Sequence, residues 1–109
     1  MSWKVEYLPE AKEDLRVLNK DVKTAVLQAI KKVMENPFPK SENGYGNPLG
    51  NKPGSKLSGF LKIKLLKYEI RVVYKLIRTE TTMTIVVIGA RRDDEVYKIA
   101  VKRKNKYDL

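Results

Sequence analysis

The chain has 109 residues and a formal net charge of +10. This length predicts one domain with a small core, and the charge predicts an anionic partner: RNA, DNA, an acidic protein or a membrane surface. Cysteine and histidine are absent, which excludes disulfides and removes the commonest metal ligands and the commonest general base. No stretch approaches the roughly 18 apolar residues of a membrane span, and the amino terminus has no signal-peptide apolar region. We therefore expect a cytoplasmic protein without a metal or another cofactor.

The amino-terminal third is predicted to form a short strand and two helices. Residues 2–7 alternate apolar and charged side chains, which is typical of a strand. Pro9 suits the first turn of a helix that runs to about Leu18. Asp21 is expected to cap a second helix that ends before Pro37. We expect the two helices to form a hairpin with one apolar stripe.

Residues 37–56 are rich in glycine and proline and are predicted to be a connection. Its lysines and Tyr45 either contact a nucleic acid or belong to a plain surface loop. Three strands are expected after it, over residues 58–66, 69–78 and 82–89. A basic helix is expected to close the chain. The order β-α-α-β-β-β-α predicts a single α+β domain over residues 1–109, with helices on one face of a mainly antiparallel, four-stranded sheet.

Two of these strands carry opposed cations. A hairpin that sets apolar side chains against each other pairs Leu65 with Ile70, because a one-residue slip would expose the core face. The same register sets Lys64 opposite Arg71. A like-charge pair destabilises a sheet by roughly 0.2–1 kcal/mol, and a bound phosphate would relieve that cost. The alternative is that these residues are solvated cations on a lysine-rich outer face.

The motifs that carry chemistry follow one another in order: Lys62-Ile63-Lys64-Leu65, Ile70-Arg71-Val72-Val73-Tyr74, Gly89-Ala90-Arg91, and Glu95-Val96-Tyr97. With these motifs, and in element order, length and charge, the chain resembles the RelE/ParE superfamily of bacterial toxins, and within it the RelE-type mRNA interferases. The resemblance implies a microbial RNase-like fold and an active site that cuts mRNA in the ribosomal A site. The implied catalytic residues are Lys62, Lys64, Arg71, Arg91 and Tyr97. Further RNA contacts are expected from Lys56, Phe60, Arg92 and Lys98.

The resemblance also implies the partners of a toxin from a type II toxin-antitoxin system. These are a cognate acidic antitoxin, the 70S ribosome with its mRNA, and operator DNA bound only through the antitoxin complex.

Metal-independent RNA cleavage needs a base for the 2'-hydroxyl proton, cations for the phosphorane charge and an acid for the 5'-oxygen. Lys64 is expected to be the base, Arg71 to bind phosphate oxygens and Arg91 to act at the leaving oxygen. Tyr97 would stack on a base or share a proton; the alternative is that it anchors the last helix. Two other functions remain open: a ParE-like inhibitor of DNA gyrase on the same fold, and a non-enzymatic RNA-binding module. A single-strand binder usually displays two or three exposed aromatic residues.

Overall fold

The computed structural model describes residues 3–49, 56–90 and 95–109, with five strands and three α-helices in those ranges. The elements are β1 (Lys4–Tyr7), α1 (Pro9–Arg16), α2 (Lys20–Val33), β2 (Asn47–Pro48), β3 (Phe60–Leu65), β4 (Ile70–Ile77), β5 (Thr82–Ala90) and α3 (Glu95–Tyr107). The strands form one sheet in the order β1-β5-β4-β3-β2. β1 runs parallel to β5, and the other pairs are antiparallel. The α+β class is confirmed, and the predicted element order holds with one strand, β2, added.

The sheet has one strand more than predicted. β2 lies inside the 37–56 connection and pairs with β3 at the edge, Asn47 opposite Lys62 and Pro48 opposite Leu61. The sequence did not predict it because two residues carry no periodicity and one of them is proline, which occurs in sheets mainly at edges.

The register between β3 and β4 is as predicted: Leu65 lies opposite Ile70, Ile63 opposite Val72, and Lys64 opposite Arg71. Burial of one face fixes this register. At the centre of that face Tyr74 is completely buried, and its hydroxyl donates a hydrogen bond to the Pro37 carbonyl at 2.8 Å. Burial raises the pKa of Tyr74, so the phenol stays neutral and acts as a donor.

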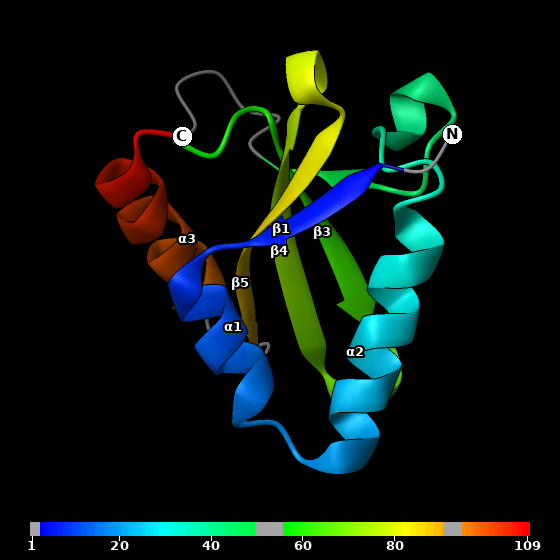
Figure 1. The fold of residues 1–109 in the computed structure, drawn as a ribbon, viewed down its shortest axis with the longest axis vertical. Helices are drawn as coiled ribbons and strands as arrows, with labels where there is room; N and C mark the ends of the chain where they lie inside the picture. Colours follow the sequence, from blue (N-terminus) through cyan, green and yellow to red (C-terminus); the bar gives the residue numbers. More distant parts are fainter. Residues whose placement is uncertain (1–2, 50–55, 91–94) are drawn as a thin grey trace.

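The first two helices do not form the predicted hairpin. α1 packs on β5, whereas α2 packs on β3, and the two helices diverge from their short connection in a V across the sheet (Figure 1). Their apolar stripes therefore meet different strands. The cap of α2 also differs from the prediction. The side chain of Asn19, not Asp21, accepts a hydrogen bond from the Val22 amide at 3.2 Å, because Asn19 is the residue with extended backbone before the helix.

The closing helix covers the opposite face from α2, not the same face. Tyr74 and Ile63 point toward α2 and the chain that follows it. Lys62 alternates with Ile63 and instead contacts Tyr97 of α3. α3 packs on β5 and β4, with Val96 and Ala100 buried. Within the described ranges, no helix is long and apolar enough to cross a membrane.

Candidate active site

Arg71 is the most buried of the predicted catalytic cations that the structure describes. It lies on the central strand β4, between Lys64 on β3 and Gly89 on β5. Its side chain is buried at 9% exposure, and its Nη1 atom has no hydrogen-bond partner among the residues that the structure describes. Buried polar atoms are nearly always paired, and an arginine stays charged when buried. The structure thus contradicts the alternative of a solvated cation for Arg71.

Lys62 and Tyr97 are brought together from distant parts of the chain. The Lys62 Nζ donates to the Tyr97 hydroxyl at 3.3 Å and lies 5.5 Å from the centre of the ring. Gly89 eases the packing of α3 beside this contact, because a Cβ at that position would lie 3.0 Å from Cγ2 of Val96. The glycine before Arg91 in the motif therefore allows the first turn of α3 to lie against the sheet.

Lys64 is exposed, and with Arg71 it lines a small cavity of about 40 Å³. Lys64 also lines a wider groove of about 510 Å³, which lies between α2 and β3. Its rim includes Lys32, Lys40 and Tyr45, and the Lys32 Nζ lies 5.5 Å from the centre of the Tyr45 ring. Residues of the 37–56 connection thus adjoin the predicted site. An exposed amine next to a basic groove suits an RNA backbone better than a neutral ligand.

The residues predicted to contact RNA differ in their exposure. Lys56 and Lys98 are exposed. Phe60 is only 1% exposed, with the Lys75 Nζ 5.2 Å from its ring centre, so its ring belongs to the core and is not free to stack on a base. Arg91 and Arg92 lie outside the described residues. Lys62, Lys64, Arg71 and Tyr97 are therefore the predicted catalytic residues that the structure brings together.

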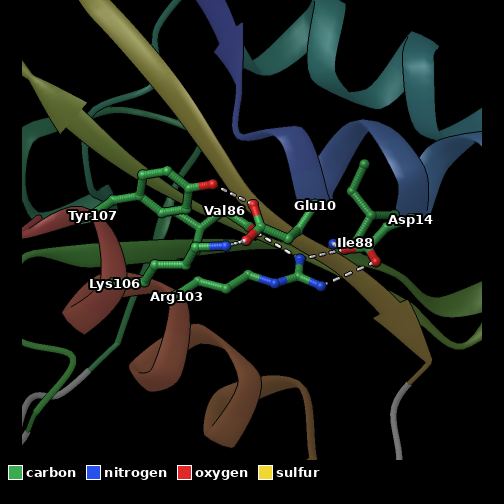
Figure 2. Close-up of polar contacts among 7 residues, drawn as sticks. All are labelled: Glu10, Asp14, Val86, Ile88, Arg103, Lys106 and Tyr107. Atoms are coloured by element: carbon green, nitrogen blue, oxygen red, sulfur yellow. Dashed lines mark hydrogen bonds and ion pairs between the residues drawn. The ribbon is translucent and has the colours of Figure 1, made fainter.

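A second polar cluster was not predicted from the sequence. It joins α1 to α3 through two carboxylates, Glu10 and Asp14, and two cations, Arg103 and Lys106 (Figure 2). No local signal marks it, because its partners are 89 residues or more apart. Among the described residues, no group of three or more His, Cys, Asp or Glu side chains is arranged to hold a metal ion.

The fold and the basic site are those of a small toxin of a type II toxin-antitoxin system. Residues 5–95 match the family described as ParE toxin of type II toxin-antitoxin system, parDE. The chain belongs to this family, within the RelE/ParE superfamily.

Individual relatives agree with this assignment. An Escherichia coli protein described as a RelE-like toxin is 26% identical over 106 residues, which cover 94% of this chain and 98% of that protein. The free double arginine-to-alanine variant of E. coli RelE superposes with a TM-score of 0.76 at 26% identity, covering 94% of this chain and 98% of that one. The same variant bound to a peptide of its antitoxin RelB gives 0.69 at 26% identity and the same coverage.

Proposed function

We propose that this RelE-like toxin is a metal-independent endoribonuclease that cleaves mRNA in the ribosomal A site and thereby stops translation. The observation that carries the proposal is Arg71, a buried guanidinium beside Lys64 whose Nη1 has no hydrogen-bond partner among the described residues. Leaving a buried charge unpaired costs several kcal/mol. A phosphodiester oxygen would pair with it, and the planar guanidinium fits two phosphate oxygens at once.

The reaction uses the RNA's own 2'-hydroxyl. Lys64, exposed beside Arg71, takes the 2'-hydroxyl proton as the 2'-oxygen bonds to phosphorus. Arg71 and Lys62 balance the charge on the phosphorane oxygens. The bond from phosphorus to the 5'-oxygen then breaks, and that oxygen takes a proton from the Tyr97 hydroxyl, which lies against Lys62, or from water. The products carry a 2',3'-cyclic phosphate and a 5'-hydroxyl. We assign to Arg91 the stabilisation of the charge on the leaving 5'-oxygen. Tyr97, held by Lys62, shares a proton or stacks on a base.

We further propose that the ribosome supplies the substrate's geometry and an acidic antitoxin silences the toxin. The basic groove beside Lys64 provides cations, but its exposed aromatic ring, Tyr45, is only one stacking platform. A free single strand is usually held on two or three such rings. The net charge of +10 favours rapid capture by an acidic chain. Operator DNA would be reached through the antitoxin complex.

The test compares purified toxin on mRNA in translating 70S ribosomes and on the same mRNA alone, with the 5'-ends mapped. In a parallel reaction the toxin is dialysed against EDTA, and the EDTA is removed, before the toxin meets the ribosomes. We expect cuts inside codons of the translated frame, 5'-hydroxyl ends and the same rate for the EDTA-treated toxin. Equal cutting of naked and ribosome-bound RNA would refute ribosome dependence, and absence of cutting in both would refute the nuclease.

Inhibition of DNA gyrase is the second candidate, because the matching family carries the description ParE. That function acts through protein contact. It gives no reason for the Lys62–Tyr97 contact or for an Arg71 Nη1 without a partner in residues 3–49, 56–90 and 95–109. A supercoiling assay with purified gyrase separates the two. Inhibition of supercoiling without RNA cleavage would establish the alternative.

A further inference from the structure

β5 has an edge that β1 does not cover, and Asp14 and Arg103 fill it. β1 pairs with β5 only as far as Ile85, because Pro9 turns the chain into α1. Beyond that point the Ile88 amide donates to Oδ2 of Asp14 at 3.1 Å, and the Val86 carbonyl accepts from Nη1 of Arg103 at 2.9 Å. A carboxylate from α1 and a guanidinium from α3 thus satisfy the backbone groups that a longer β1 would have paired.

The two side chains are also paired with each other. Nη1 of Arg103 donates to Oδ2 of Asp14 at 2.6 Å, and Nη2 donates to Oδ1 at 3.3 Å. The Arg103 and Asp14 side chains are 16% and 20% exposed, so solvent screens this pair less than a surface pair. Figure 2 shows the Asp14 carboxylate reaching both the guanidinium and the β5 backbone. One carboxylate therefore ties together α1, β5 and α3.

Both tied elements lead to the candidate active site. β5 ends at Gly89 and Ala90, next to Arg91 in the chain. α3 carries Tyr97 six residues before Arg103, which is roughly 9 Å along a helix axis. The bond from the Lys62 Nζ to the Tyr97 hydroxyl is 3.3 Å long, and a small shift of α3 would break it. In addition, Lys106 and Tyr107 both donate to Glu10 at 2.7 Å and fasten the end of α3 to α1.

We propose, on the basis of the proposed function, that Asp14 is a positioning residue for RNA cleavage: by holding Arg103 and the Ile88 amide, it sets the place of α3 and thus of Tyr97 opposite Lys62. Asp14 itself contacts neither Lys62 nor Tyr97 and takes no part in proton transfer.

The test variant is Asp14→Asn, which keeps the size of the side chain and an acceptor for the Ile88 amide. It removes the negative charge and turns an NH₂ group toward Arg103. The matched control is Glu13→Gln. Glu13 is the neighbouring carboxylate on α1 and pairs with Arg16 on the same helix. It is exposed. Arg103→Lys is the second variant, because it keeps the charge and removes the fork.

The first readout is amide hydrogen exchange of residues 96–107 in the free toxin, which requires no RNA. We expect Asp14→Asn to speed exchange in α3 by at least about tenfold, with a cooperative thermal transition, whereas Glu13→Gln leaves it unchanged. Unchanged exchange in both Asp14→Asn and Arg103→Lys would overturn the positioning role. If Asp14→Asn does not fold, unchanged exchange of α3 in Arg103→Lys alone would overturn the positioning role.

The second readout is single-turnover cleavage on translating ribosomes. We expect Asp14→Asn to lower the maximal rate by at least about tenfold with half-saturation unchanged, and by less than about twofold in a Tyr97→Phe background. An equal loss in both backgrounds would show that Asp14 does not act through Tyr97. A wild-type toxin that cuts no RNA would overturn the proposed function and with it the catalytic consequence, whereas the exchange result would still decide whether Asp14 holds α3.

Discussion

At the scale of single residues, Arg71 combines a cost to folding with a use in binding. It is buried on the central strand of the sheet, where an apolar side chain would pack without desolvating a charge. Replacing buried charged groups with apolar residues of similar volume is often neutral or stabilising. A protein that keeps an arginine there is therefore expected to gain stability, and to lose activity, when the charge is removed.

We predict that Arg71→Met raises the free energy of unfolding by about 1 kcal/mol and the Tm by about 4 °C, while ribosome-dependent cleavage falls more than about tenfold. Thermal unfolding and single-turnover cleavage measure the two effects. Lys75→Met is the control, since Lys75 follows Arg71 on the same face of β4 but lies opposite Phe60. A loss of stability in Arg71→Met would mean that the fold depends on this guanidinium.

Lys64 differs from Arg71 because it is exposed. Lys64→Ala should lower single-turnover cleavage by more than about tenfold, or about 1.4 kcal/mol of barrier, and change stability by no more than about 0.5 kcal/mol. Arg91→Ala should lower cleavage to a similar extent. Lys67→Ala, an exposed lysine in the turn after β3, should cut at the wild-type rate. Wild-type cleavage by Lys64→Ala would remove Lys64 from its assigned role.

At the scale of elements, α3 is joined to α1 by contacts that respond to pH. Lys106 and Tyr107 hydrogen-bond the Glu10 carboxylate and lower its pKa from the ordinary 4.5 to about 2. A carboxyl group with a lowered folded-state pKa stabilises the fold above the unfolded-state value and loses that contribution as the pH falls through the folded-state value. The contribution of Glu10 is therefore complete above pH 4.5 and disappears on the way to about pH 2.

Thermal unfolding of the wild type and Glu10→Gln between pH 7 and pH 2 tests this linkage. We expect the wild type to be the more stable at pH 7 and the difference in Tm to shrink below pH 4.5. Glu35→Gln is the control, because Glu35 is exposed and forms no ion pair with any described residue. A difference that did not change with pH would show that the Glu10 contacts contribute through packing and not through charge.

The turn between β4 and β5 offers a second test at this scale. Thr81 closes a 3₁₀ turn over Arg78–Glu80 with φ of +50°, a left-handed conformation that β-branched residues rarely adopt. Thr81→Gly should raise the free energy of unfolding by about 1 kcal/mol, measured by urea denaturation. Thr79→Gly lies in the same turn without a positive φ and should lower it instead. If Thr81→Gly and Thr79→Gly both lowered the free energy of unfolding, the contacts of the Thr81 side chain would stabilise the fold by more than its backbone strain costs.

At the scale of the whole molecule, we expect the excess positive charge to favour association with an acidic antitoxin. α3 exposes Lys98 and Lys102 and half-buries Lys104, so an acidic antitoxin that covers this helix would meet several cations at once. Removing the helix itself would expose the buried Val96 and Ala100. Charge is therefore better tested by substitution than by truncation.

We predict that replacing Lys98, Lys102 and Lys104 together with glutamine weakens binding of the cognate antitoxin and makes its salt dependence shallower. Titration calorimetry at several salt concentrations measures both. Glutamine at Lys20, Lys31 and Lys40 changes the net charge equally on other elements and should have the smaller effect. Equal effects of the two sets would mean that overall charge, and not α3, attracts the antitoxin.

The sequence by itself determined the element order, the register of β3 against β4 and the identity of the cations. Apolar periodicity and proline positions are local properties, and one buried face allows only one register. Only the tertiary structure decided which face α3 covers, that Arg71 is buried and that Tyr97 meets Lys62. It also placed Phe60 in the core and joined Asp14 to Arg103. These outcomes depend on pairing between segments far apart in the chain, where the free energy comes from burial and desolvation that no local pattern records.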